Sequence, residues 1–277
     1  MEEGDVPYLL NGVFRRMNYV AWGDPGNDPV ICLHGLTRTG RDFDALAQAL
    51  SGSFFVICPD LPGRGTSEWL PTPALYQPAT YIVAIGHLLA AIQRPVMWIG
   101  TSLGGIVGMA IAAAERSPVT RLVLNDVGPM VPQAGLRRIR EQVAEDMPEF
   151  DDMAELEAHL RRIHAAFAPM TDADWAHLAR ISARVLPDGR LTLHYDPKIA
   201  DPIKANNPSD TDLWQLWAAI KIPVLAIRGA QSDVLLPETL ARMAQGGAQT
   251  MEVAGAGHAP SLMDAPTIER IRAFLTG

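Results

Sequence analysis

The chain has 277 residues, of which 48% are hydrophobic and 19% are charged, and it carries a formal net charge of −8. This composition is that of a folded globular protein, and the length allows one large α/β domain or two smaller ones. The acidic balance argues against nucleic acid and against an anionic membrane surface as partners, because both are themselves negatively charged.

The sequence also predicts a cytoplasmic location. Residues 1–5 are acidic and contain no apolar stretch of the kind that a signal peptide needs. No apolar run reaches the ~18 residues that a transmembrane helix requires. Cys32 and Cys58 lie in apolar runs typical of strands, so we expect both to be buried and reduced, with no disulfide.

The first half of the chain alternates short apolar runs with helical patterns. In the segment 43–50, for example, Phe43, Leu46, Ala47 and Leu50 fall on one helical face. The expected strands are 16–22, 30–33, 54–58, 96–99 and 121–125, and the expected helices are 43–50, 81–92 and 106–114. Strands separated by helices in this way form a parallel sheet that is covered on both faces.

The pattern changes from about residue 129 to residue 213, where no convincing strand run is found. Amphipathic helices rich in Arg and Glu are expected at 136–143, 153–167 and 174–185, and 190–195 alternates only briefly. The alternation then resumes, with strands at 223–228 and 249–253 and helices at 237–245 and 265–275. A helical insertion inside an α/β sheet indicates a cap or lid, so we predict a core domain (1–128 and 214–277) and a cap (129–213).

Residues 100–104, Gly-Thr-Ser-Leu-Gly, lie between an expected strand and an expected helix. The pattern G-x-S-x-G at such a turn is the nucleophile elbow, which would expose the hydroxyl of Ser102 at the tip of a strained turn. Gly100 and Gly104 are needed because the strand and the helix pass too close for side chains. The pattern alone is common in a glycine-rich chain, so its interpretation depends on whether Ser102 has partners.

A serine hydroxyl needs a base to take its proton, and the base needs an acid to orient it. His258 lies in a glycine-rich loop directly after the last expected strand, at the sheet edge where active sites form, and we predict that it is the base. The remaining histidines of the helices and of the segment 129–213 are expected at the surface: His87, His159, His164, His177 and His194. Without an H-E-x-x-H pattern, no metal site is expected.

Two aspartates follow neighbouring expected strands and could supply the acid. Asp233 comes after the strand at 223–228, and Asp126 comes after the strand at 121–125. Both precede His258, as the chain order serine, acid, histidine requires. We favour Asp233, and Asp126 is the alternative, whose other interpretation is a turn or helix cap at the entrance to the cap segment.

An oxyanion hole needs two fixed N–H donors for the charge that develops on the carbonyl oxygen. One donor is expected to be the backbone N–H of Leu103, at the start of the helix that follows Ser102. The other is expected from Leu36, in the loop His34-Gly35-Leu36 that follows the strand at 30–33. We expect His34 to brace this loop rather than to take part in the chemistry.

Together these segments resemble the α/β-hydrolase superfamily, and in particular its lidded, esterase-like branch. The resemblance rests on His34-Gly35, residues 60–67 (Asp-Leu-Pro-Gly-Arg-Gly-Thr-Ser), residues 100–105, Asp233 and Gly257-His258. It implies the α/β-hydrolase fold, an eight-stranded and mostly parallel sheet with helices on both faces and a helical cap inserted between the sixth and seventh strands. It also implies acyl transfer to water without a cofactor.

Single residues separate this chain from some branches of that superfamily. Haloalkane dehalogenases and epoxide hydrolases have Asp where this chain has Ser102, and prolyl aminopeptidases usually have Trp where it has Leu103. The carbon–carbon hydrolases that act on ring-cleavage products share the layout. They often have a second Gly in the oxyanion loop, where this chain has Leu36.

We therefore predict a carboxylesterase-like serine hydrolase that acts through an acyl-enzyme on small, largely apolar acyl or aryl esters. The Met and Trp residues of the cap suggest such an apolar pocket. One alternative is a carbon–carbon or lactone hydrolase with the same triad, and another is a non-catalytic ligand receptor on the same fold. The expected partner is a small-molecule substrate, and the chain is expected to be a monomer or a homodimer.

Overall fold

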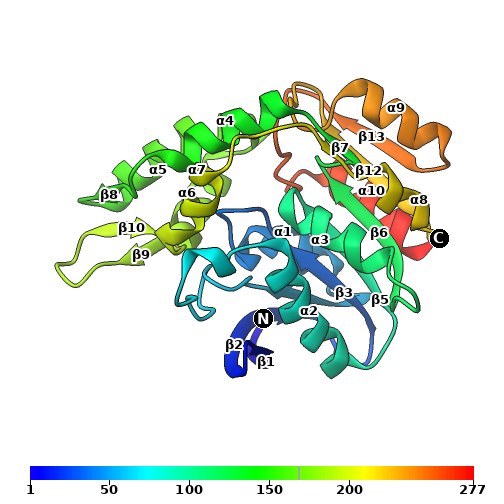
Figure 1. Ribbon diagram of the computed structural model, residues 1–277, viewed down its shortest axis with the longest axis horizontal. Coiled ribbons are helices and arrows are strands. Elements are labelled where there is room, and N and C mark those ends of the chain that lie inside the picture. The colour runs from blue at the N-terminus through cyan, green and yellow to red at the C-terminus, as the bar shows by residue number, and fades with distance from the viewer. Residues whose placement is uncertain (168) are drawn as a thin grey trace.

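The structure, a computed structural model, describes residues 1–167 and 169–277. The strands of its central sheet (Figure 1) are β1 (Glu2–Leu10), β2 (Val13–Trp22), β3 (Asp28–Leu33), β4 (Phe54–Pro59), β5 (Val96–Thr101), β6 (Val119–Asn125), β12 (Val224–Gly229) and β13 (Gln249–Val253). Their order in the sheet is β1-β2-β4-β3-β5-β6-β12-β13. Only the pairs β1–β2 and β2–β4 of this sheet are antiparallel, so the predicted fold class is confirmed.

β1 is the strand of this sheet that the sequence pattern did not predict. Its apolar residues Val6, Tyr8 and Leu10 are buried, and the residues between them are exposed. This alternation over residues 6–10 is the signal of a half-buried strand, but it is short and follows an acidic start. The antiparallel pairing with β2 places β1 at the edge of the sheet. An antiparallel strand can expose one face to solvent, so the burial of Val6, Tyr8 and Leu10 on the other face stabilises it.

Helices cover the two faces of the sheet and define two apolar cores. One core lies under α2 (Pro78–Ile92), α3 (Leu103–Ala112), α8 (Trp214–Ala219) and α9 (Pro237–Gln245), and the other under α1 (Asp44–Leu50) and α10 (Ala265–Thr276). In β3, Ile31 and Leu33 enter the first core, and Val30 and Cys32 enter the second. A strand that is buried on both faces explains the continuous apolar run seen in the sequence.

The segment 129–213, which we call the inserted segment, lies between β6 and β12, the sixth and seventh strands of the central sheet. Figure 1 shows its helices grouped to one side of that sheet. Their bounds are α4 (Gln133–Ala144), α5 (Met153–Ile163), α6 (Asp172–Ser182) and α7 (Ala200–Ala205). The segment has a buried core of its own, made of Phe150, Leu156, Leu160, Trp175, Leu178, Ala179 and Leu193.

The inserted segment also contains short strands that were not predicted. They are β7 (Met130–Val131), β8 (Glu149–Phe150), β9 (Ala183–Val185), β10 (Leu191–Leu193) and β11 (Thr211–Asp212). The sheet β8-β10-β9 takes the residues at which the predicted helix 174–185 was to end, so α6 stops at Ser182. Strands of two or three residues give at most a brief alternation, as at 190–195, and the partners of β7, β8 and β11 are distant in the sequence.

The two ends of the inserted segment are held together by the antiparallel pair β7–β11, which aligns Met130 with Asp212 and Val131 with Thr211. This ribbon supports the predicted cap boundaries at residues 129 and 213, which stay a prediction. Cys32 and Cys58 are free and buried, as expected. Across the described part of the chain, no helix has the length and apolar character that crossing a bilayer requires.

Candidate active site

The carboxyl ends of five neighbouring strands bring the predicted site residues to one edge of the sheet. β3 leads into the loop with Leu36, β5 leads into Ser102, and β13 leads into His258. The Ser102 N–H donates to the carbonyl oxygen of Asn125, the last residue of β6, over 3.0 Å. The parallel register therefore places the loops after β3, β5, β6, β12 and β13 beside one another.

Ser102 occupies the strained turn that the motif predicts. Its backbone φ is 52° and its ψ is −114°, a conformation that residues other than glycine rarely adopt. A Cβ on Gly100 would collide with the backbone of Gly104, and a Cβ on Gly104 would collide with the carbonyl group of Leu33. Gly100 thus allows β5 and α3 to approach each other closely, and Gly104 allows α3 to approach the end of β3, so that the serine is held at the turn.

His258 joins Ser102 to a carboxylate. Its Nε2 lies 3.0 Å from the Ser102 Oγ, and its Nδ1 lies 2.7 Å from the Asp126 Oδ2. With a proton on Nδ1, the ring donates to Asp126 and leaves Nε2 free to accept the proton of the serine. The structure thus brings together the predicted nucleophile Ser102, the predicted base His258 and the alternative acid Asp126.

Asp233, the preferred acid, does not contact His258, and this preference is corrected by the structure. Its carboxylate instead accepts two hydrogen bonds from Arg138 of α4, at 2.6 and 2.7 Å. The hydrogen bonds from Arg138 hold the pKa of Asp233 below its ordinary value. The Asp233 side chain is 41% exposed, whereas that of Asp126 is fully buried, so Asp233 faces the inserted segment and Asp126 faces the histidine.

Asp126 is held by hydrogen bonds on both carboxylate oxygens. Oδ1 accepts the Gly229 N–H over 2.8 Å, and Oδ2 accepts the Ser232 hydroxyl over 2.5 Å in addition to the His258 ring. Donors on every side stabilise the charged form of a buried carboxylate. Ser232 was not singled out from the sequence, although its position beside Asp233, in the loop after β12, is the signal that could have found it.

The loop that contains Leu36 lies against the nucleophile. A Cβ on Gly35 would be 3.8 Å from the Ser102 Cβ, and the Leu36 carbonyl accepts a hydrogen bond from the Arg64 Nε over 2.8 Å. Within the described residues, neither the Leu36 N–H nor the Leu103 N–H donates to a protein acceptor. Both amides are therefore available for a ligand oxygen, although their predicted role in an oxyanion hole stays a prediction.

His34 spans two loops of the site. Its Nδ1 lies 2.7 Å from the Gly35 carbonyl oxygen, and its Nε2 accepts the Leu61 N–H over 2.9 Å. These two partners require the neutral tautomer with the proton on Nδ1. Complete burial, opposed only partly by the hydrogen bond to Gly35, lowers the pKa of His34 to about 3. This geometry fits the bracing role expected from the sequence.

The buried His34 is expected to make folding stability fall as the pH falls. Because its pKa is depressed in the folded state, His34 contributes its full stability above pH ~6.5 and loses it progressively toward pH 3. The limiting slope is about 1.4 kcal/mol per pH unit. Asp60 acts in the opposite sense, because burial raises its pKa to about 6 and its contribution is lost as the pH rises.

Urea unfolding of the wild type and of His34→Gln at several pH values separates the contribution of His34 from that of Asp60. The free-energy difference between the two proteins should shrink as the pH falls from 6.5 to 4, since only the wild type carries the depressed histidine. Parallel curves for the two proteins over this range would show that His34 titrates normally.

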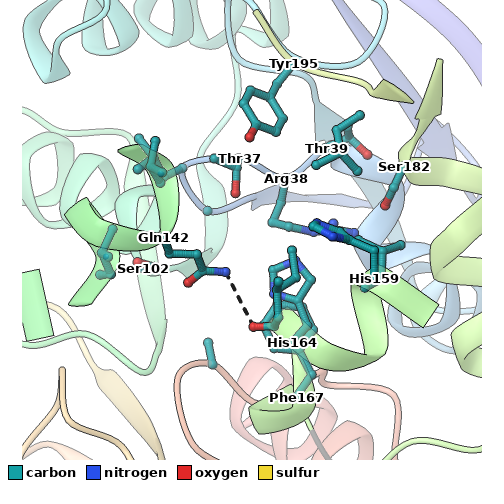
Figure 2. Close-up of a pocket in the computed structure, with 18 of the residues that line it drawn as sticks. Thr37, Arg38, Thr39, Ser102, Gln142, His159, His164, Phe167, Ser182 and Tyr195 are labelled. Atoms are coloured by element: carbon teal, nitrogen blue, oxygen red, sulfur yellow. Dashed lines mark hydrogen bonds between the residues drawn. The ribbon is translucent and has the colours of Figure 1, made fainter. Parts of the chain in front are cut away.

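A cavity of about 120 Å³ opens beside Ser102 and His258. Polar side chains line part of it, as Figure 2 shows, and include Thr37, Arg38, Thr39, Gln142, Ser182 and Tyr195. Among the described residues, none of the methionines and tryptophans of the inserted segment lines this cavity. Trp175, for example, packs in the core of the inserted segment, so the apolar part of the wall comes from other residues, such as Ile139, Leu160 and Phe167.

Three histidines that were expected at the surface line the cavity instead: His159, His164 and His194. Burial lowers the pKa of each of them. His164 also stacks on Phe167, with ring centroids 4.3 Å apart. His164 continues the helical spacing of the buried Leu156 and Leu160, four residues at a time, and this periodicity could have predicted its inward position.

The inserted segment contacts the loop that carries His258. The Gly257 N–H donates to the Ala166 carbonyl oxygen over 2.8 Å, next to the histidine in the chain. The Gly65 N–H donates to the His194 carbonyl oxygen over 2.9 Å, which fixes the segment to the loop after β4. His177 of α6 lies 3.2 Å from the Asp44 carboxylate, and His87 of α2 is half-buried and accepts the Leu9 N–H. The part of the chain that the structure describes contains no cluster of His, Cys, Asp or Glu suited to a metal ion.

The fold, the strained turn at Ser102 and the hydrogen-bonded triad Ser102–His258–Asp126 together define a class of protein. The chain matches the alpha/beta hydrolase family over residues 30–270, and it belongs to that family. The resemblance inferred from the sequence is confirmed, and the chain is a hydrolase.

Similar proteins cover the whole chain. A 3-hydroxybutyrate-oligomer hydrolase from Cupriavidus necator is 41% identical, over 99% of this chain and 97% of the relative. Among solved structures, a putative hydrolase from Rickettsia typhi is 31% identical with a TM-score of 0.93, covering 100% of this chain and 99% of the other. An α/β hydrolase from Novosphingobium aromaticivorans is 35% identical with a TM-score of 0.89, covering 99% and 98%.

Proposed function

We propose that this hydrolase cleaves the ester bonds of short hydroxyacid oligomers of the 3-hydroxybutyrate type. The observation that carries the ester chemistry is the hydrogen-bonded row Ser102–His258–Asp126 at the wall of a cavity. The similarity to the oligomer hydrolase supports the substrate class, because it extends over the inserted segment that forms much of the cavity. The cavity is lined by both apolar and hydrogen-bonding side chains, which fits a substrate that alternates ester groups with short hydrocarbon segments.

In the first half of the reaction, the Ser102 Oγ attacks the ester carbonyl carbon while the His258 Nε2 takes the serine proton. The C–O bond to the alcohol portion then breaks, and His258 donates that proton to the departing oxygen. An alcohol leaves, and an acyl group remains on Ser102. Asp126 stays ionised throughout and stabilises the imidazolium that forms between the two proton transfers.

Water completes the second half. His258 takes a proton from the water as its oxygen attacks the acyl carbon, and it returns the proton to the Ser102 Oγ as the free acid leaves. Each tetrahedral intermediate carries an oxyanion, which the N–H groups of Leu36 and Leu103 would bind. The loss of one such donor typically costs ~3 kcal/mol of transition-state stabilisation.

The substrate class can be tested with linear dimers and trimers of (R)-3-hydroxybutyrate and with p-nitrophenyl butyrate. We expect the oligomers to be cleaved to monomer with a higher kcat/KM than the p-nitrophenyl ester, as measured by chromatography of the products. Cleavage of p-nitrophenyl butyrate with no turnover of either oligomer would refute the substrate class and leave the ester chemistry standing. Carbon–carbon or lactone substrates in the same assay test the alternatives that share the triad.

A further inference from the structure

Two residues that line the cavity each have a buried hydroxyl that finds no hydrogen-bond partner among the described residues. The two hydroxyls are the Thr39 Oγ1 and the Ser182 Oγ, each in a residue that is only 4% exposed. Both residues line the cavity beside Ser102. A buried hydroxyl without a partner costs free energy, so its presence on a cavity wall points to a ligand atom that completes it.

The usual local partners of these hydroxyls are unused. Thr39 precedes the short 3₁₀ helix Gly40–Phe43 in the capping position, yet its side chain makes no cap hydrogen bond. Ser182 is the last residue of α6, where a serine commonly bonds to a carbonyl group of the preceding turn, and its Oγ makes no such bond. Both hydroxyls are thus without a protein partner in the part of the chain that the structure describes.

The two hydroxyls come from different parts of the fold. Thr39 belongs to the oxyanion loop of the core, and Ser182 belongs to the inserted segment, whose helix α6 packs against the 3₁₀ helix after Thr39. In the view of Figure 2, both lie on the far side of Arg38 from Ser102. The Arg38 Cγ would be 3.9 Å from a Cβ on Gly35, and that Cβ would be 3.8 Å from the Ser102 Cβ, so the Arg38 side chain starts close to the nucleophile.

The charges around the pair favour an uncharged ligand group. The Arg38 Nε and Nη2 are occupied by Asp42, at 2.8 and 2.6 Å, which neutralises the guanidinium. Burial keeps the pKa of His164 well below its ordinary value, and burial with Arg162 lowers that of His159, so both rings are neutral. The exposed carboxylates of Glu145 and Asp146 also line the cavity and favour an ester carbonyl of the substrate over its terminal carboxylate beside them.

We propose that Thr39 and Ser182 form a subsite that donates hydrogen bonds to a second, uncharged carbonyl oxygen of the substrate, next to the ester that is cleaved. This inference rests on the proposed ester hydrolysis at Ser102 and deepens it. A linear hydroxyacid oligomer of three or more units carries an uncharged ester carbonyl besides the one that is cleaved, whereas a simple alkyl ester carries none. The subsite would therefore select polyesters over alkyl esters of the same length.

Two pairs of probes test the subsite on either side of the cleaved bond. On the acyl side, p-nitrophenyl 3-methyl-5-oxohexanoate is compared with p-nitrophenyl 3-methylhexanoate, which lacks only the second carbonyl oxygen. On the alcohol side, methyl 3-(butyryloxy)butanoate is compared with hex-2-yl butyrate, and butyrate release is measured. We expect kcat/KM to be about tenfold higher for the carbonyl-bearing member of at least one pair, given about 2- to 13-fold per neutral hydrogen bond.

The variants Thr39→Val and Ser182→Ala, alone and combined, show whether the hydroxyls cause the preference. In the double variant the ratio of kcat/KM between the carbonyl-bearing member and the alkyl member should fall to about twofold or less. The melting temperature should hold or rise, because each change removes an unpartnered buried hydroxyl. Thr192→Val is the matched control: its buried Oγ1 donates to the Pro148 carbonyl oxygen over 2.8 Å, so this variant should lose stability and keep the preference.

The outcomes separate this inference from the proposed function. Turnover of both members without a preference in either pair, or a preference that survives in the double variant, would overturn the subsite and leave the esterase intact. Failure to cleave any of the four esters would overturn the proposed function and the subsite together.

Discussion

Ser102→Ala is expected to lower kcat on p-nitrophenyl butyrate by about 10⁵- to 10⁶-fold, because no other group in the hydrogen-bonded row can form the acyl-enzyme. The N–H donors around the carbonyl oxygen would remain, so a residual acceleration of about 10³-fold over water should persist. The melting temperature should change little, since the side chain lies at the cavity wall and makes its described hydrogen bond to His258 alone. Turnover and thermal unfolding of the purified variant measure both effects.

Labelling with a fluorophosphonate probe gives a second readout that does not depend on the choice of substrate. The wild type should take up one label per chain, and Ser102→Ala should take up none. Ser51→Ala, which removes a hydroxyl bound to the Gln48 carbonyl oxygen at the end of α1, is a control that should keep both label and activity. Undiminished turnover or labelling in Ser102→Ala would remove Ser102 from the mechanism.

The sheet and the position of the serine could be predicted because their signals are local. The strand-to-helix turn at residues 100–104 needs small residues at fixed offsets, and the loop of His258 follows a strand directly. β3 and β5 are buried on both faces, which leaves continuous apolar runs in the sequence. Each of these signals can be read within about ten residues.

The acid could not be chosen from the sequence because the choice depends on contacts between distant segments. β6 and β12 are adjacent and parallel, so Asp126 and Asp233 both emerge at the same edge of the sheet. What separates them is the direction of the side chain. Arg138, 95 positions earlier in the chain, draws Asp233 toward α4, while Gly229 and Ser232 hold Asp126 beneath His258.

The residues of the inserted segment that line the cavity could not be predicted for a related reason. Methionine and tryptophan in a helical insertion can pack in its own core or face a ligand, and their spacing is the same in both cases. Trp175 packs in the core of the inserted segment. His159 of α5 and His164, directly after α5, line the cavity. Which face of a short helix meets the core domain is decided by tertiary packing, which one sequence does not display.

We expect opposite effects on kcat when each of the two aspartates is replaced by asparagine. Asp126→Asn should lower kcat by about 10⁴-fold, because the new amide can present an N–H to the His258 Nδ1. The ring then carries its proton on Nε2, where it can no longer accept the proton of Ser102. The side chain keeps its shape, and its remaining oxygen can still accept the Gly229 N–H, so the fold should be retained.

Asp233→Asn is the matched comparison, since it makes the same chemical change one strand away. It should leave kcat within about threefold of the wild type and cost at most about 1 kcal/mol of stability, because its ion pair with Arg138 is partly exposed on both sides. Steady-state kinetics and urea unfolding of the two variants, prepared in parallel, make the comparison. If Asp233→Asn were the inactive variant and Asp126→Asn the active one, the hydrogen bond between His258 and Asp126 would have no part in catalysis, and the acid would have to reach the histidine through a rearrangement of α4.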